Sequence, residues 1–143
     1  METVLFICTH NSARSQMAEA FLNALCGDKY EAQSAGITPT GLNPYVVKAM
    51  AEIGIDLSTH RSKSILEFQG KPFDYVVTVC DAAREACPFF PGEKEISKSF
   101  PDPSEFKGTE AEIMEKVREL RDEIRDWVEQ TFCKSQQQSS RVV

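Results

Sequence analysis

Two reactive side chains, Cys8 and Arg14, stand at the ends of a short segment that we name the anion loop (residues 8–14). An apolar run precedes the loop and apolar residues at helical spacing follow it, which predicts a turn from a strand into a helix. Backbone N–H groups in such a turn converge on an anion, the helix N-terminus adds positive potential, and a guanidinium clamps a tetrahedral oxyanion. The predicted oxyanion-binding residues are Thr9, His10, Asn11, Ser12, Ala13 and Arg14.

Cys8 is the candidate nucleophile of this loop. The positive potential at the loop favours its thiolate, which is the form that attacks. Ser15 follows Arg14 directly and can donate a hydroxyl hydrogen bond to that thiolate. A thiolate held beneath a bound oxyanion is placed to attack phosphorus or arsenic. A buried structural cysteine beside a surface arginine is the alternative, and the flanking strand, the flanking helix and Ser15 disfavour it.

Asp102 is the candidate acid for the same site. It stands between Pro101 and Pro103, which restrict the backbone around it. A carboxyl held over the anion could protonate the oxygen that leaves as Cys8 attacks. Local sequence alone favours an ordinary turn aspartate, because Asp-Pro turns are common. The presence of the anion loop reverses that preference.

The rest of the chain predicts the elements that position these residues. Strands and helices alternate, which predicts a single-domain α/β sandwich around a small parallel sheet, spanning residues 1–134, with a disordered tail at 135–143. Ligands of such sheets bind beyond the C-terminal ends of the strands, where Cys8, Cys80 and Asp102 are all expected. The predicted strands are residues 2–7, 30–35, 73–79 and 94–99, and the predicted helices are 12–26, 44–54 and 108–132, with a short helical turn at 64–68.

Composition excludes several classes of protein. The chain has 143 residues, of which 41% are hydrophobic and 27% charged, and its formal net charge is -6. This balance is typical of a soluble globular domain and argues against general binding of nucleic acid or anionic membranes. The sequence shows no transmembrane stretch, signal peptide or zinc-ligand spacing, so we expect a cytoplasmic protein without a metal.

The five cysteines indicate chemistry rather than a disulfide scaffold, because the compartment is expected to be reducing and an odd number cannot pair fully. Cys26 and Cys133 end predicted helices and are interpreted as structural or incidental. His60 is expected to be an exposed loop residue. The arginines of the last helix are expected to form a solvated face, namely Arg118, Arg121 and Arg125.

Residues Cys8 to Ser15, together with the later Asp102-Pro103, resemble the low-molecular-weight protein tyrosine phosphatase fold family. The resemblance covers nearly all of residues 2–133. It implies a three-layer α/β/α sandwich with four parallel strands in the order 2-1-3-4. It also implies a phosphate-binding anion loop and Asp102 as the acid.

The second half of the chain resembles one branch of that family. Val76-Val77-Thr78-Val79-Cys80, followed by Cys87-Pro88, is similar to the thioredoxin-coupled arsenate reductases, in which the two later cysteines form a redox pair. Ser104-Glu105 stands where the phosphatases commonly carry two tyrosines, which removes an aromatic wall for phosphotyrosine. The resemblance therefore implies reduction of arsenate to arsenite. The implied catalytic residues are Cys8, Cys80, Cys87, Arg14, Asp102 and Ser15.

The implied enzyme needs no cofactor, and phosphate or sulfate would compete with arsenate. Thioredoxin is the expected electron donor, glutaredoxin with glutathione is less favoured, and a monomer is expected. A phosphatase that hydrolyses phosphate monoesters is the alternative in the same family. A non-catalytic module that binds oxyanions or senses redox state is the alternative outside catalysis.

The chain departs from the family pattern at two positions. Ala13 stands where many thioredoxin-coupled relatives carry another loop cysteine. In the implied relay Cys8 attacks arsenate and Cys80 and then Cys87 resolve the intermediate, so that loop cysteine is not used. Some members bind potassium beside the loop, and Asn11, Glu19 and Ser34 match three of the ligand positions. Lys63 stands at the fourth, where an aspartate is typical, so its ammonium is expected to pair with Glu19 and replace the metal.

Overall fold

The computed structural model describes residues 1–79 and 94–134. Cys80 and Cys87 lie outside the described residues, as does the predicted tail at 135–143. The anion loop, Asp102 and the elements around them lie within the described residues.

A four-stranded parallel sheet forms the centre of the protein, with the strand order β2-β1-β3-β4. This order confirms the prediction. The last two strands are shorter than the predicted 73–79 and 94–99, and Asp74, directly before the third strand, accepts hydrogen bonds from Thr3 with its side chain. The strands are β1 (Glu2–Cys8), β2 (Tyr30–Gly36), β3 (Tyr75–Thr78) and β4 (Lys94–Ser97).

Side-chain caps mark the beginning of α2 and α4. Asn43 accepts a hydrogen bond from the N–H of Tyr45, and Pro44 occupies the first turn of α2 (Pro44–Ala51). Thr109 and Glu112 form a reciprocal capping box that starts α4 (Glu110–Val128). The remaining helical elements are α1 (Arg14–Cys26), η1 (Ile65–Phe68), η2 (Pro103–Glu105) and η3 (Glu129–Lys134).

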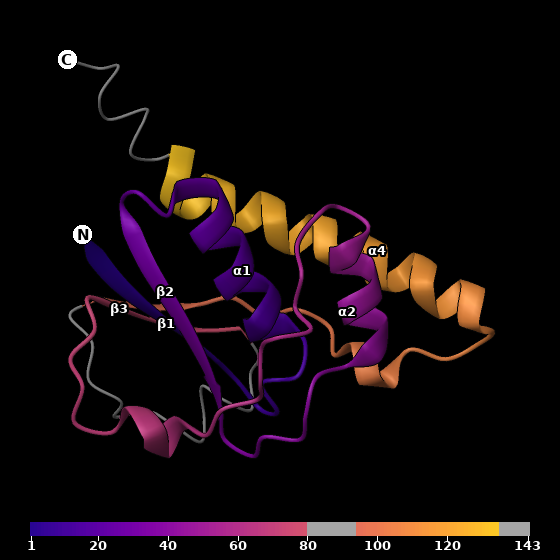
Figure 1. Cartoon of the computed structure of the whole chain (residues 1–143), viewed down its shortest axis with the longest axis horizontal. Coiled ribbons are helices and arrows are strands. Elements are labelled where there is room, and N and C mark those ends of the chain that lie inside the picture. The colour runs from indigo at the N-terminus through magenta and orange to yellow at the C-terminus, as the bar shows by residue number, and fades with distance from the viewer. Residues whose placement is uncertain (80–93, 135–143) are drawn as a thin grey trace.

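The helices pack against the sheet and against one another. α1 packs on β1 and β2 and lies beside α4, and α2 contacts the first half of α4 (Figure 1). The predicted apolar stripe of α4 is confirmed, since four of its five residues are buried and Ile113 is partly buried. β1 is buried from Val4 to Cys8, as expected for a central strand. The buried stripe residues are Val117, Leu120, Ile124 and Val128.

Not all of the arginine face of α4 is solvated. Arg121 is only 8% exposed, so the prediction was wrong for this residue. Its guanidinium donates to the carbonyl of Ala49 and to the carboxylate of Glu52, which also binds Arg118. These contacts tie the end of α2 to α4 and explain why an arginine is buried there.

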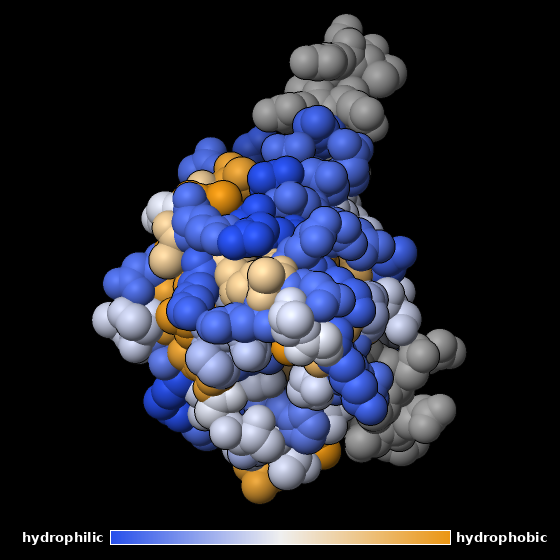
Figure 2. Space-filling model, turned by 90° about the vertical axis from the view of Figure 1, so that its right-hand side faces the viewer, coloured by the Kyte–Doolittle hydropathy of each residue, from blue (hydrophilic) through white to orange (hydrophobic). Residues whose placement is uncertain are grey.

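The surface over α2 and the beginning of α4 is largely hydrophilic, with small scattered apolar patches (Figure 2). Within residues 1–79 and 94–134, no helix combines the length and apolarity needed to span a membrane.

Cys26 and Cys133 form a disulfide that joins the end of α1 to the last turn of the described chain. The sequence predicted these two cysteines to be structural or incidental and gave no indication that they pair. Cys26 lies at the opposite end of α1 from Arg14, roughly 18 Å away at 1.5 Å per helical residue. The disulfide is therefore remote from the anion loop.

Candidate active site

The anion loop lies at the C-terminal edge of the sheet, directly after β1. Its carbonyl groups accept hydrogen bonds from backbone N–H groups of residues 37–43, which lie outside the loop. Because a trans peptide holds C=O and N–H in opposite directions, the N–H groups that follow these carbonyls point toward the concave side of the loop. The carbonyls are those of Cys8, Thr9, His10 and Ser12.

Cys8 is buried, and it carries the free thiol among the cysteines that the structure describes. The N–H of Asn11 donates to its Sγ at 3.2 Å, and Ser15 Oγ lies 2.9 Å from the same sulfur. The Asn11 side-chain amide donates to Ser15 Oγ at 2.7 Å, so the serine hydroxyl hydrogen remains available for a Cys8 thiolate. The predicted pairing of Cys8 with Ser15 is thus seen in the structure.

Asn11 has a left-handed backbone conformation, with φ of 50°. Its Oδ1 accepts from the N–H of Lys63 at 2.8 Å, and because a backbone N–H can only donate, this contact fixes the orientation of the amide. The Asn11 carbonyl accepts from Ser62 Oγ at 2.9 Å. The segment around residue 62 therefore holds the loop in its curved shape.

Arg14 is 7% exposed and points into the site. One terminal nitrogen donates to the carbonyl of Phe100 at 3.1 Å, and the other lies 3.7 Å from Oδ2 of Asp102. The buried Nε has no hydrogen-bond partner among the described residues. A buried donor of this kind calls for a ligand acceptor, and a tetrahedral oxyanion in the loop would supply one.

Asp102 comes from the far half of the chain and lies next to Arg14, as predicted. Its Oδ1 accepts from the N–H and hydroxyl of Ser104, which fixes the carboxyl at the start of η2. Partial burial raises the pKa of Asp102. The hydrogen bonds from Ser104 and the charge of Arg14 lower it by more, so the pKa lies below its ordinary value. The net shift therefore favours the ionised carboxylate.

The other loop residues have mainly backbone roles. The ring of His10 points outward and its Nδ1 lies 3.2 Å from the carbonyl of Thr38, and Ala13 is buried at the start of α1. Gly36 makes the close approach of β2 to the loop possible, because a Cβ there would lie 2.8 Å from the nitrogen of Asn11. The sequence predicted Gly36 only to end a strand.

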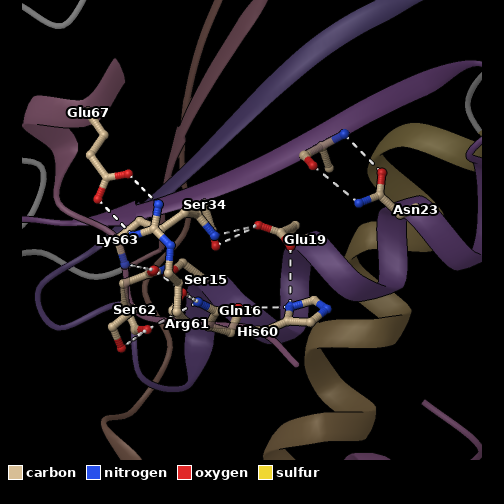
Figure 3. Close-up of polar contacts among 12 residues, drawn as sticks. Ser15, Gln16, Glu19, Asn23, Ser34, His60, Arg61, Ser62, Lys63 and Glu67 are labelled. Carbon is tan, nitrogen blue, oxygen red and sulfur yellow. Dashed lines mark hydrogen bonds and ion pairs between the residues drawn. The ribbon is translucent and has the colours of Figure 1, made fainter. Parts of the chain in front are cut away.

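A buried polar cluster supports the loop from behind (Figure 3). Glu19 of α1 accepts from Ser34 Oγ at 2.7 Å and has the ammonium of Lys63 3.5 Å away. His60 Nδ1 lies 3.2 Å from Oε1 of Gln16 and 3.5 Å from Glu19. The predicted pairing of Lys63 with Glu19 is confirmed. His60 lies in a loop, as predicted, but its side chain is only 27% exposed, because it lies against Gln16 and Glu19.

A cleft of about 270 Å³ opens beside the loop, between residues 40–45 and η2. Its lining includes Ser12 of the loop, Ser104, and two partly buried aromatic residues, Tyr45 and Phe106. The sequence argument expected no aromatic wall here because Ser104-Glu105 replaces two tyrosines. Tyr45 and Phe106 supply aromatic surface from other positions.

The comparisons with known proteins agree with this geometry. The model of the family described as low molecular weight phosphotyrosine protein phosphatase matches residues 3–138. The chain belongs to this family. A protein of Halalkalibacterium halodurans named arsenate reductase is 44% identical over 124 residues, which cover 86% of this chain and 89% of the relative. An arsenate reductase of Bacillus subtilis is 43% identical over 122 residues, covering 85% and 88%.

Solved structures of the family have the same architecture. An arsenate reductase in the oxidized state superposes with a TM-score of 0.80 at 29% identity, over 94% of this chain and 98% of that one. A thioredoxin-dependent arsenate reductase of Corynebacterium glutamicum gives a TM-score of 0.60 at 28% identity, over 92% of this chain and 63% of that one. The low-molecular-weight phosphatase of T. tengcongensis, at 24% identity and a TM-score of 0.73, shares the fold.

Proposed function

We propose that the protein reduces arsenate to arsenite. The observation that carries the proposal is the arrangement of Cys8, Ser15 and Arg14, in which a thiol with a hydroxyl donor faces a loop shaped for a tetrahedral oxyanion. The relatives named arsenate reductase span most of the chain and support the choice of arsenate over other oxyanions. Phosphate and sulfate, which have the same shape, would compete for the loop.

In the first step, the Cys8 thiolate attacks arsenic and forms an S–As bond while one oxygen leaves as water. Arg14 and the loop N–H groups stabilise the charge on the anion. We assign the protonation of the departing oxygen to Asp102, whose carboxyl lies beside Arg14 at the loop. Arsenic remains pentavalent at this stage.

In the second step, Cys80 attacks Sγ of Cys8. The S–As bond breaks, its electron pair stays with arsenic, and arsenite leaves as a Cys8–Cys80 disulfide forms. Cys87 then attacks Cys80, which frees Cys8 and leaves a Cys80–Cys87 disulfide. Two thiols thus supply the two electrons that arsenic gains.

The sheet register supports the use of Cys80. Thr78 pairs with Ile7, and the N–H of Val79 donates to the carbonyl of Ile7 at 2.9 Å. The backbone that leads to Cys80 is therefore held beside the strand that ends in Cys8. None of the cysteines that the structure describes suits the second step, because Cys26 and Cys133 are paired with each other and lie far from Cys8.

The final disulfide needs an external reductant, and we propose thioredoxin acting on a cytoplasmic monomer. The similarity to a thioredoxin-dependent arsenate reductase favours thioredoxin over glutaredoxin with glutathione. A reducing compartment would keep the relay thiols ready for the next turnover. Arsenate-dependent NADPH oxidation, measured with thioredoxin and thioredoxin reductase and then with a glutaredoxin system, distinguishes the two donors.

Replacement of Cys80 tests the relay. Cys80→Ser should abolish multiple turnovers of arsenate and leave Cys8 able to attack an anion. Cys26→Ser, at the remote disulfide, is the matched control and should retain turnover. Sustained turnover by Cys80→Ser would show that the three-cysteine scheme is wrong.

The aromatic cleft favours a second candidate activity, slow hydrolysis of aryl phosphate monoesters. Tyr45 and Phe106 can contact an aromatic ring whose phosphate occupies the anion loop. This hydrolysis would use Cys8 and Asp102 but no later cysteine, so Cys80→Ser should leave it intact. Release of p-nitrophenol from p-nitrophenyl phosphate measures it directly.

A further inference from the structure

Gln16 is a polar residue at a fully buried position in the first turn of α1. Its Nε2 lies 2.9 Å from Oδ1 of Asn11, 3.3 Å from the Asn11 carbonyl and 2.9 Å from the carbonyl of Arg61. Its Oε1 lies 3.2 Å from Nδ1 of His60. Gln16 therefore connects the anion loop to the segment of residues 60–63 with both ends of its amide.

The contacts of Gln16 converge on a residue whose conformation matters for the nucleophile. Asn11 has a positive φ, which is uncommon for a residue with a side chain and costs free energy unless its surroundings hold it. In this conformation its N–H reaches Sγ of Cys8, and its side-chain amide reaches Ser15 Oγ. Asn11 thus controls two of the groups that surround the sulfur.

From these contacts we propose that Gln16 is a positioning residue for Cys8. It fixes Asn11 from behind the loop, and Asn11 in turn orients its own N–H and Ser15 toward the sulfur. Gln16 does not contact the sulfur and is not itself a catalytic residue. The inference rests on the proposed role of Cys8 as nucleophile.

A purely structural role for Gln16 is the competing explanation, and α1 contains a residue that represents it. Asn23 also bridges α1 to another element, since its amide donates to the carbonyl of Ala32 at 3.1 Å and accepts from its N–H at 2.9 Å. Figure 3 shows both amides on the same helix, with Asn23 turned away from the loop. Loss of Asn23 would weaken packing without affecting the loop.

The test compares Gln16→Met with Asn23→Leu, two substitutions that keep a side chain of similar size but remove the hydrogen bonds. Both variants should melt a few degrees lower than the wild type. Only Gln16→Met should slow arsenate turnover, with kcat at least about tenfold lower and the KM for arsenate within about twofold, because the nucleophile is misplaced while the anion donors remain.

Alkylation by iodoacetamide separates this inference from the proposed function. In protein that carries Cys80→Ser and Cys87→Ser, Gln16→Met should slow alkylation of Cys8 severalfold at neutral pH, whether or not the natural substrate is arsenate. Gln16→Glu, which keeps the shape but loses every donor, should behave similarly if Gln16→Met does not fold. Alkylation equal to the wild type, or equally slowed by Asn23→Leu, would overturn the inference.

Discussion

The ammonium of Lys63 lies 3.5 Å from Oε1 of Glu19, and their side chains are only 15% and 10% exposed. Ser34 donates to the same carboxylate oxygen, and His60 lies near the other. A fixed positive charge therefore lies beside the buried Glu19 carboxylate, at the position where the sequence resemblance implies a potassium site in some family members. The residues do not fit a metal ion, and the described part of the chain has no cluster of three metal-ligating His, Cys or acidic side chains.

Potassium should therefore have no specific effect on this protein. The melting temperature and kcat should be the same in potassium chloride and sodium chloride at equal ionic strength, because the Lys63 ammonium already neutralises Glu19. A melting temperature several degrees higher in potassium would contradict this assignment. Thermal denaturation in the two salts is the measurement.

Removal of Lys63 should make the stability of the protein depend on potassium. Lys63→Ala leaves the Glu19 carboxylate buried without its cation, so the melting temperature should fall in sodium and recover in part in potassium. Lys48→Ala is the matched control, because Lys48 pairs with Glu110 at a site where both side chains are about two-thirds exposed. Equal responses of the two variants to potassium would show that the effect is general screening.

Arg14 should be irreplaceable by lysine. Arg14→Lys keeps the charge but loses the Nε donor and the fork that contacts Phe100, so phosphate should bind roughly ten- to a hundredfold more weakly. Calorimetric titration of phosphate into Cys8→Ser protein, with and without Arg14→Lys, measures this loss apart from chemistry. Arg61→Lys, at an exposed pair with Glu67, is the control and should bind phosphate normally.

The sequence predicted the sheet order, the anion loop and the convergence of Cys8 with Asp102, because these follow from strand–helix alternation and strand ends. It did not predict the supporting layer. Gln16 and His60 come together only because residues 60–63 fold back on α1, a contact between segments far apart in the chain. The polar side chains of Gln16 and Glu19 among the apolar residues of α1 were the available signal.

The disulfide shows a different limit of sequence reasoning. Cys26 and Cys133 are 107 residues apart, and neither spacing nor composition indicates which of five cysteines are neighbours. The aromatic cleft was missed for a similar reason, since Tyr45 and Phe106 come from separate segments. Both features depend on tertiary contacts that local patterns do not encode.

The link between α2 and α4 should make stability depend on acidic pH. The hydrogen bond from Arg118 lowers the pKa of Glu52 most, burial raises it, and Arg121 lowers it further, to about 2 from 4.5. Because the folded-state pKa is depressed, this stabilisation is complete above about pH 4.5 and is lost as the pH falls toward about 2. Glu52→Gln should therefore melt lower than the wild type at neutral pH, and the difference should shrink over that interval.

A second carboxyl variant distinguishes the pH effect of Glu52 from general acid unfolding. Glu119→Gln removes an exposed acid of α4 that lies apart from this link and should change the melting temperature little at any pH. Melting curves of the three proteins between neutral pH and about pH 2 make the comparison. A Glu52→Gln difference that grows on acidification would contradict the assigned direction of the pKa shift.

The Cys26–Cys133 disulfide should stabilise the fold without taking part in turnover. A bond that closes a loop of about a hundred residues removes chain entropy worth roughly 3–5 kcal/mol from the unfolded state, which corresponds to about 10 °C in melting temperature for a chain of this size. Cys133→Ser should lower the melting temperature by about that amount under non-reducing conditions. Arsenate turnover at a temperature where both proteins are folded should be unchanged, because the bond lies at the far end of α1 from Cys8.

Reducing agent provides the control for this last prediction. Dithiothreitol should lower the melting temperature of the wild type toward that of Cys133→Ser and should leave the variant nearly unchanged. Peptide mapping of samples taken before and after arsenate turnover should find Cys26 linked to Cys133 in both. An exchange of either cysteine into a disulfide with Cys8 would show that the pair belongs to the catalytic relay instead of the scaffold.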